Sequence, residues 1–365
     1  MNYRSICFII LSLGPGGAER YTSELANYLI NNGYDVNIIL LSKSNIFYNL
    51  NEDIKVFQPK KNLIKNTFFK KTIKLFQIAN YLRDTLIKLQ PSMVFNFAFP
   101  SLILLATIGI NLNFYLFLRS NPSKTYMIER YNIPLSIRKL LYRRAKALIA
   151  QTDGAYKILS RQFPKTKIFK IPNIINNESI EYNFKGKKES IIITAGRLIR
   201  SKQIDHAIMA FSKLNAPSWK LFIIGEGPEK NYLKSLVKKF DIESSVYFIG
   251  NVKNIQSYFK KSEIFIFSSA HEGFPNVLLE AMATPLACVS YNCEFGPSEL
   301  IINEKNGYLI ENGNIKELKE KLQTLVDSSY IRKKFSNNAS NLRGLYNASE
   351  IGEKVENLLI KNKYE

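Results

Sequence analysis

Several residue types that mark common classes of protein are scarce in this sequence. It contains three cysteines, Cys7, Cys288 and Cys293. Their odd number and wide spacing exclude a disulfide framework and a zinc-binding pattern, and indicate a reducing compartment. The chain has two histidines, no D-x-D motif, and no group of histidine, cysteine and carboxylate at metal-ligand spacing. We therefore expect neither a bound metal ion nor a cofactor.

Signals for export or for membrane insertion are also missing. No small-residue cleavage site follows the apolar start of the chain, so we expect a buried first strand rather than a signal peptide. The longest apolar stretch, residues 99–120, is interrupted by Gly109, Asn111 and Asn113. A short helix followed by a buried strand explains this stretch better than a membrane span does.

Acidic residues are few: 30 Asp and Glu stand against 51 Lys and Arg, which gives a net charge of +21. Most of the excess lies in residues 1–180, and it is densest in residues 60–83, where lysines alternate with bulky apolar residues at roughly helical spacing. This pattern favours a basic amphipathic face on an anionic membrane, which predicts a cytoplasmic protein held peripherally at the inner membrane. The alternative is an ordinary lysine-rich, solvated helix.

A chain of this charge also binds DNA non-specifically, so a basic module for nucleic acid or another polyanion is a further hypothesis. Such a module needs aromatic side chains along a basic groove. The 24 Phe and 20 Tyr are instead spread through the expected strands and helices. We therefore expect no specific nucleic-acid partner.

Length and periodicity predict two domains, because 365 residues are too many for one ordinary core. Short apolar runs alternate with longer helical patterns, and the series restarts after residue 188, which predicts an α/β fold of two tandem Rossmann-like, doubly wound domains. The joint is expected near residues 170–173, where a proline ends a strand. The expected strands include residues 6–13, 35–42, 93–99, 113–120, 146–152, 167–173, 189–198, 219–225, 245–252, 263–270 and 286–292.

Glycine turns follow the expected strands. Gly14, Gly16 and Gly17 lie between the first strand and a helix, and Gly225 follows a strand of the second half. Glycine lets the backbone approach a ligand, and a helix start offers free N–H groups to an anion. Any tight strand-to-helix turn also favours glycine. The first turn is neither a full G-x-G-x-x-G motif nor a Walker loop.

Charged residues follow two strands of the second half. Arg197 and Lys202 flank a turn directly after a strand, and a guanidinium with an ammonium suits a diphosphate; ordinary surface basicity is the alternative. Glu272 precedes a Gly-Phe-Pro turn, and Glu280 lies in the apolar helix that starts at about Pro275. Carboxylates there can accept hydrogen bonds from sugar hydroxyls. The amides of residues 276–278 would form an anion site.

The run EGFPNVLLEAMA resembles the E-x7-E signature of the retaining glycosyltransferase family 4, whose members have the GT-B fold, with two Rossmann-like domains facing a cleft. GGAER near the start, PN at the joint, and GRLIRSK, IGEGP, GPSELI and NGYLI fall where that family has its blocks, so the resemblance covers nearly the whole chain. It implies an acceptor-binding, membrane-facing domain over residues 1–172 and a donor-binding domain over residues 173–345. It also implies a final segment, residues 346–365, that packs back on the first domain.

The resemblance also implies roles for individual residues. Glu280 would hold the ribose and Glu272 the donor sugar, while Arg197 and Lys202 would neutralise the diphosphate. The residues implied in catalysis are Glu272, Arg197 and Lys202. The residues implied in donor binding are Glu280, Gly16, Gly17, Phe274, Pro275, Asn276, Val277, Gly225 and Val252.

One departure from the family concerns a histidine that many relatives carry in the first domain. Both histidines here, His206 and His271, lie in the second half. The corresponding strand end contains Arg119, Ser120 and Asn121, which we expect on the acceptor side. His206 is expected to be a helix residue rather than a catalyst.

Together these features predict transfer of a hexose or N-acetylhexosamine from a nucleotide sugar, preferably a UDP-sugar, to a lipid-linked glycan. The family implies retention and thus an α-linkage in surface polysaccharide or glycan assembly, and the missing D-x-D motif predicts transfer without a metal ion. A sugar-nucleotide epimerase with the same fold is the alternative enzyme.

Overall fold

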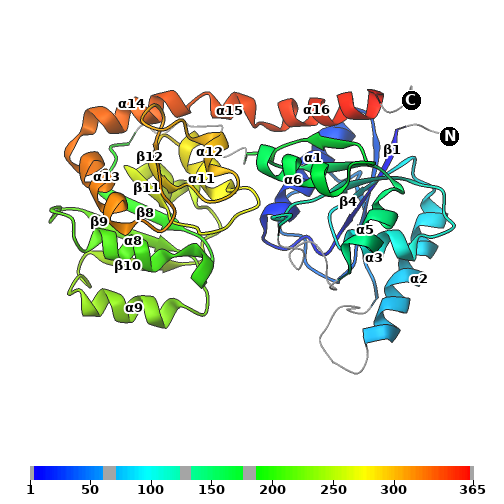
Figure 1. The fold of residues 1–365 in the computed structure, drawn as a ribbon, viewed down its shortest axis with the longest axis horizontal. Coiled ribbons are helices and arrows are strands. Elements are labelled where there is room, and N and C mark those ends of the chain that lie inside the picture. The colour runs from blue at the N-terminus through cyan, green and yellow to red at the C-terminus, as the bar shows by residue number, and fades with distance from the viewer. Residues whose placement is uncertain (1–3, 61–70, 124–132, 176–185, 362–365) are drawn as a thin grey trace. The chain divides into compact units, whose positions relative to one another are not determined.

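The computed structural model describes residues 4–60, 71–123, 133–175 and 186–361 (Figure 1). The chain divides into two compact units, one made of Met1–Ile174 with Ala348–Glu365 and the other of Ile175–Asn347. The chain passes from one unit to the other after residues 174 and 347, slightly later than the borders after residues 172 and 345 that the sequence predicted. Beyond the expected joint, residues 176–185 lie outside the described residues.

The first unit is built on seven parallel strands in the order β3-β2-β1-β4-β5-β6-β7. The central strand β1 is buried over its whole length because it has neighbours on both edges and helices on both faces. The strands are β1 (Ser5–Ile10), β2 (Asp35–Leu40), β3 (Lys55–Phe57), β4 (Met93–Asn96), β5 (Asn113–Phe117), β6 (Ala145–Ala150) and β7 (Ile168–Lys170).

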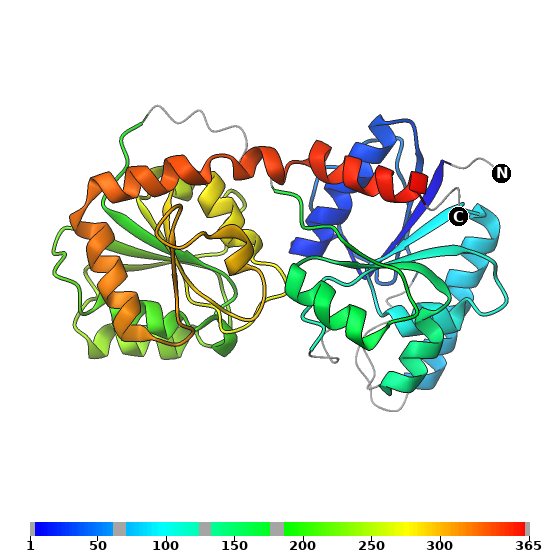
Figure 2. The same cartoon turned by 45° about the horizontal axis from the view of Figure 1, so that its top comes forward.

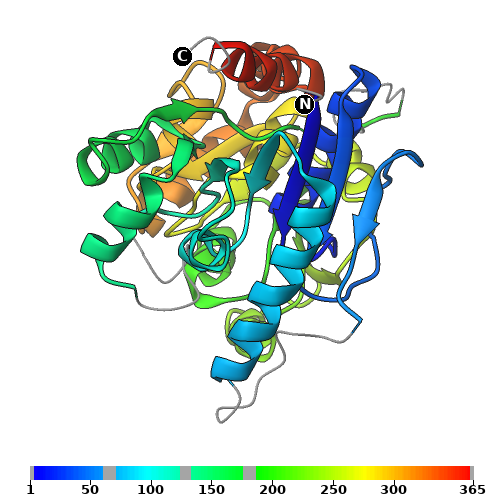
Figure 3. The ribbon, with the colours of Figure 1, turned by 90° about the vertical axis from the view of Figure 1, so that its right-hand side faces the viewer.

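Helices cover both faces of this sheet. On one face α1 (Gly17–Asn31) lies beside α16 (Ala348–Lys361), as Figure 2 shows, and Gly352 leaves room there for the ring of Tyr28. On the other face lie α2 (Lys71–Leu89), seen in Figure 3, α3 (Pro100–Ala106), α5 (Leu135–Tyr142) and α6 (Asp153–Gln162). The last helix of the chain therefore belongs to the first unit.

The second unit repeats the plan with six parallel strands in the order β10-β9-β8-β11-β12-β13. The strands are β8 (Ile191–Ala195), β9 (Lys220–Ile224), β10 (Val246–Gly250), β11 (Ile264–Phe267), β12 (Ala287–Tyr291) and β13 (Tyr308–Ile310). The helices are η2 (Arg200–Lys202), α8 (Ile204–Phe211), α9 (Lys230–Lys239), α10 (Gln256–Lys261), α11 (Asn276–Ala283), α12 (Pro297–Leu300), α13 (Ile315–Asp327), α14 (Ser329–Ala339) and α15 (Leu342–Leu345).

These sheets confirm the prediction of two doubly wound α/β domains. The sequence patterns missed the edge strands β3 and β13, which have three residues each, although the equally short β7 was predicted within residues 167–173. The apolar stretch 99–120 contains helix α3 and strand β5, as expected, and no described helix is long and apolar enough to cross a membrane. Much of the charge-dense segment 60–83 lies outside the described residues; its described part belongs to α2.

Candidate functional site

Each sheet has a point where the strand order reverses, between β1 and β4 in the first unit and between β8 and β11 in the second. Ligands of open α/β sheets bind beyond the carboxyl ends of the strands at such points. In the second unit, the segments that follow β8 and β11 are residues 196–202 and 268–275. These are two of the segments that the sequence marked as functional.

The structure brings Lys202 and Glu272 together, although 70 positions separate them. The ammonium Nζ of Lys202 lies 2.5 Å from Oε1 of Glu272, and the two side chains are 21% and 13% exposed. Two further hydrogen bonds join the segments: Ser268 Oγ donates to the carbonyl of Lys202, and the amide of Ala270 to that of Ser201, both at 2.9 Å. The turn is therefore held at the end of β11 with its carboxylate on the lysine.

Cys293 lies close to this pair, in the segment after β12, and nothing in the sequence pointed to it. The nearby charges of Glu272 and Lys202 both act on its thiol. Burial, aided by the negative charge of Glu272, raises the pKa of Cys293 to about 12. At neutral pH Cys293 is therefore a protonated thiol. It packs near the charge pair and does not act as a nucleophile.

Glu280 lies in the second turn of α11 and is 5% exposed. The residues on either side of it in the helix, Leu279 and Ala281, are buried as well. Glu280 is therefore not a glutamate on the exposed surface of the helix. A buried carboxylate requires polar partners. The side chain of Glu280 is therefore held by polar contacts as well as by its place in the helix.

The amides at the start of α11 differ from the expectation. The N–H of Asn276 donates to the carbonyl of Phe274, and that of Leu278 donates to the carbonyl of Pro275, both at 3.0 Å. Pro275 has no N–H. The amides of Asn276 and Leu278 are used in hydrogen bonds within the turn. Of the expected amides, those of Phe274 and Val277 are the candidates for binding an anion.

Gly225 has a clear structural role. Its φ is +132°, and a Cβ there would lie 1.9 Å from the carbonyl oxygen of Gly196, in the turn after β8. The amide of Gly196 bonds to the carbonyl of Ile224 at 3.0 Å. The glycine is needed because two backbone turns touch, which is the plainer of the two readings of the sequence.

The other residues expected in the second unit are spread around this edge. Arg197 is exposed directly after β8, and its guanidinium makes no hydrogen bond or ion pair with the described residues. Phe274 is buried with its ring centroid 6.1 Å from that of Tyr346, and Pro275 packs against Gly296. Val252 is half-buried against the same core. These apolar residues stabilise the turn by packing, and their side chains have no polar group to offer a ligand.

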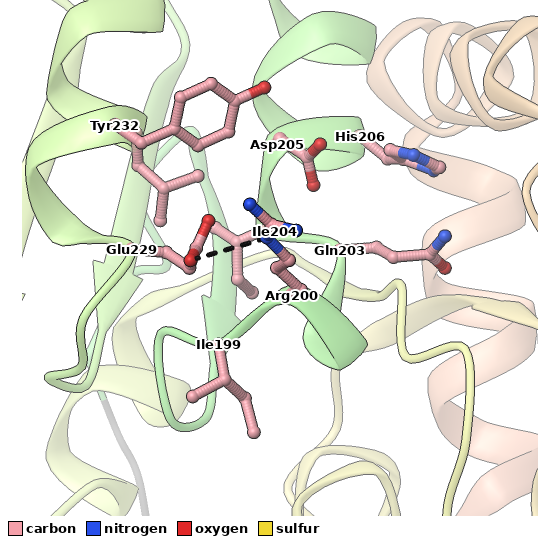
Figure 4. A pocket seen from close by; sticks show the side chains of 9 residues that line it. Ile199, Arg200, Gln203, Ile204, Asp205, His206, Glu229 and Tyr232 are labelled. Carbon is pink, nitrogen blue, oxygen red and sulfur yellow. Dashed lines mark ion pairs between the residues drawn. The ribbon is translucent and has the colours of Figure 1, made fainter.

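A cavity of about 560 Å³ opens next to η2, between the starts of α8 and α9 (Figure 4). Arg200 and Glu229 face each other there at 3.8 Å. None of the site residues predicted from the sequence lines this cavity. His206, which was predicted to be a helix residue rather than a catalyst, does line it. His206 does lie on α8, its Nδ1 is 3.1 Å from the hydroxyl of Tyr291, and burial lowers its pKa.

In the first unit, Gly16 and Gly17 lie where β1 passes into α1. The amide of Gly16 donates to the hydroxyl of Tyr48 at 3.2 Å, and Gly17 is exposed. Among the described residues, no group of three or more His, Cys, Asp or Glu side chains is arranged to hold a metal ion.

The acceptor-side candidates follow β5. Arg119 donates through Nη1 to Oδ1 of Asn173 at 2.7 Å. Ser120 is half-buried, and Asn121 is buried with its side-chain oxygen accepting hydrogen bonds from Ser123. Asn121 therefore stabilises a turn. Arg119 differs from it because Nε and Nη2 of its guanidinium have no hydrogen-bond partner among the described residues.

Two protein-family models match the chain: the one described as Glycosyltransferase Family 4 over residues 15–179, and the one described as Glycosyl transferases group 1 over residues 176–342. A glycosyltransferase of Haemophilus influenzae is 29% identical over 363 residues, covering 98% of this chain and 100% of that protein. The N-acetylgalactosamine-N,N'-diacetylbacillosaminyl-diphospho-undecaprenol 4-alpha-N-acetylgalactosaminyltransferase of Campylobacter jejuni is 29% identical over 343 residues, which is 90% of this chain and 92% of that protein.

Among solved structures, a single-residue variant of S. aureus TarM, in complex with fondaparinux, alpha-GlcNAc-glycerol and UDP, superposes with a TM-score of 0.80 at 16% identity. That match covers 97% of this chain and 99% of the other. Anabaena HepE, in complex with UDP and glucose, gives a TM-score of 0.77 at 16% identity, over 98% and 99% of the two chains. At such identities these likenesses establish the fold.

Proposed function

We propose a reaction for this chain, which belongs to glycosyltransferase family 4 and is a transferase with the GT-B fold. It transfers a hexose or N-acetylhexosamine from a UDP-sugar to a lipid-linked glycan in surface polysaccharide or glycan assembly. The acceptor is supported by the Campylobacter relative, whose name gives a diphospho-undecaprenol-linked sugar. The donor is supported by the UDP bound to TarM and HepE.

The observation that carries the proposal is the pair of Lys202 and Glu272, 2.5 Å apart beside the strand-order reversal of the second unit. Cleavage of a donor leaves a nucleoside diphosphate whose negative charge grows in the transition state. Lys202 supplies a fixed positive charge to it, and the exposed Arg197 adds a second. Glu272 holds the ammonium in place and accepts hydrogen bonds from the donor sugar.

In this mechanism two side chains do the work that a divalent metal does in other transferases, so transfer proceeds without one. Glu280, fixed in the second turn of α11, accepts hydrogen bonds from the ribose hydroxyls. The sugar is transferred with retention, and a typical α-linked donor gives an α-linkage.

We further propose that the first unit lies on an anionic membrane at the cytoplasmic face. Large apolar side chains are exposed on the mutually contacting helices α3 and α5 and just after α3, among them Leu105, Ile108 and Leu140, which is 65% exposed. Basic side chains accompany them: Arg83 donates to the carbonyl of Ile108 at 2.7 Å, and Arg144 to that of Thr107 at 2.8 Å. Apolar residues ringed by cations suit anionic headgroups above acyl chains.

The test is transfer of labelled sugar with Lys202→Ala and Glu280→Ala, each assayed with EDTA and with Mg²⁺. We expect each variant to lose activity, Lys202→Ala by roughly 10²- to 10³-fold, as for loss of one charge-stabilising group. The matched control is Lys321→Ala, which breaks a surface ion pair of the same unit at 3.3 Å.

Wild-type rates in both site variants would show that the site is wrongly assigned. Activity abolished by EDTA and restored by Mg²⁺ would refute metal independence. The anomeric coupling in the NMR spectrum of the product reports retention or inversion. Conversion of the donor without any acceptor would identify an epimerase instead.

A further inference from the structure

An arginine whose guanidinium is largely buried and incompletely hydrogen-bonded lies at the carboxyl edge of the first sheet. Arg119 follows β5, and its guanidinium carbon lies 3.5 Å from the ring centroid of Tyr21. The rings of Phe117 and Phe97 lie 5.2 Å and 5.6 Å away. The guanidinium therefore lies among three aromatic rings.

The donors of Arg119 are used on one side only. Its Nη1 bonds to Asn173, whereas Nε and Nη2 are buried and have no hydrogen-bond partner in the part of the chain that the structure describes. Nε and Nη2 form the edge of a guanidinium that holds two oxygens of one carboxylate or phosphate in parallel hydrogen bonds. This two-donor edge has no acceptor among the described residues.

No carboxylate balances this charge. Among the described residues, Arg119 forms no ion pair with Asp or Glu. Burial lowers its pKa, and the neighbouring group that opposes this effect is the hydroxyl of Tyr21. A buried cation without a counter-charge is costly, so a fold that keeps one has a use for it or receives an anion from outside.

The neighbours at this edge are donors as well. Asn96, at the end of β4, is fully buried, and its side-chain Nδ2 has no hydrogen-bond partner within the described ranges. Gln151, just after β6, donates to the same Asn173 oxygen that accepts from Arg119, at 3.2 Å. Since β4, β5 and β6 are adjacent and parallel, these ends meet at one edge of the sheet.

We propose that Arg119 forms an oxyanion subsite in the first unit, with its Nε and Nη2 holding a phosphate group and Asn96 as a further donor. The subsite rests on the proposed function for its ligand, which is a phosphate of either of two substrates. One is the diphosphate that links the acceptor glycan to its lipid. The other is the diphosphate of the nucleotide donor.

The first experiment measures binding of inorganic pyrophosphate by calorimetry to the full chain carrying Lys202→Met, which weakens the site in the second unit. Adding Arg119→Lys keeps a positive charge but removes the two-donor edge. We expect it to weaken binding at least tenfold. The control is Arg161→Lys, since Arg161 is exposed in the last turn of α6 and belongs to neither phosphate site, so we expect this change to leave binding unchanged. Equal affinity with and without Arg119→Lys overturns the proposal.

The second experiment identifies the source of the phosphate by comparing two acceptors with the same sugar, a short prenyl-diphosphate-linked one and a neutral alkyl glycoside. If the subsite holds the acceptor, Arg119→Lys raises KM tenfold or more for the diphosphate acceptor alone. If it holds the donor, the variant lowers kcat with both acceptors and weakens inhibition by UDP. Unchanged kinetics with both acceptors overturn the subsite.

The two proposals fail separately. A wild-type protein that transfers sugar to neither acceptor contradicts the proposed function. Loss of pyrophosphate binding in Arg119→Lys would still establish the anion subsite in that protein.

Discussion

The two units share the order of their first six strands but present different chemistry at the carboxyl edges of their sheets. In the second unit the edge carries a cation and a carboxylate already paired, Lys202 with Glu272. In the first unit it carries Arg119, whose guanidinium lies among aromatic rings and amides and forms no ion pair with a described carboxylate. The scaffold therefore fixes where a ligand can bind, and the residues placed after two or three strands decide what it is.

The largest effect is expected where backbone turns of the second unit touch. Gly225→Ala introduces a Cβ 1.9 Å from a backbone oxygen, at a φ of +132°. We expect a loss of ~3–5 kcal/mol in the free energy of unfolding, by combined strain and overpacking. Urea denaturation measures it.

The control for this change is Gly344→Ala, in helix α15, where a Cβ meets nothing within 4 Å. It should stabilise the protein by up to ~1 kcal/mol, because alanine favours a helix. If Gly225→Ala is as stable as this control, the two turns do not depend on the glycine.

The next effect concerns the charge pair itself. Glu272→Gln keeps the size of the side chain but removes the negative charge that holds Lys202. We expect the transfer rate to fall ~10- to 10²-fold, because a loosely held cation stabilises the leaving group less well. Glu304→Gln, which breaks the exposed pair with Lys321, is the matched control in the same assay. Equal rates in the two variants would remove Glu272 from the mechanism.

Lys188 provides a test at a buried cation of the second unit, outside the site. Burial lowers its pKa from 10.5 to about 8. Between these values the unfolded chain binds a proton that the folded protein does not, so this group makes stability rise with pH from about 8 to about 10.5. Lys188→Met should remove that rise and raise the free energy of unfolding at pH 7 by ~1–3 kcal/mol.

Urea denaturation from pH 7 to 10 measures the change, with the exposed neighbour Lys187→Met as control. Identical pH profiles for wild type and Lys188→Met would mean that this ammonium is solvated. Lys188 donates to the carbonyl of Pro285, and losing that bond reduces the gain without changing its sign.

The smallest effect should come from the exposed apolar side chains of the first unit. Leu140→Ser removes one of several such contacts, so we expect vesicles rich in anionic lipid to bind the variant several-fold more weakly in a flotation assay. Tyr330→Ser, at a side chain 75% exposed in the second unit, should leave flotation unchanged. Equal losses in both variants would remove the assignment of the membrane surface to the first unit.

The repeating plan of the fold could be predicted because buried parallel strands are continuous apolar runs, and these are visible one at a time. The strands β1, β5 and β8 were found in this way. The edge strands β3 and β13, of three residues each, were not found, whereas the equally short edge strand β7 was.

The candidate site was partly within reach of the sequence. Spacing alone located Glu272 on a turn and Glu280 on the helix behind it. It did not give the bond from Glu272 to Lys202, because that contact depends on β8 and β11 being adjacent. Cys293 was missed for the same reason, and two of the amides expected at α11 turned out to be used inside their own turn.

By itself, then, the sequence determined the local matters: which segments are strands, where the turns fall, and which residues with useful chemistry follow them. Only the tertiary structure decided which of those residues meet. It also decided that Gly225 is needed for packing and that two donors of Arg119 have no acceptor among the described residues. The physical reason is that periodicity and turn chemistry act over a few residues, whereas contacts between strand ends depend on strand order, which no short stretch of chain contains.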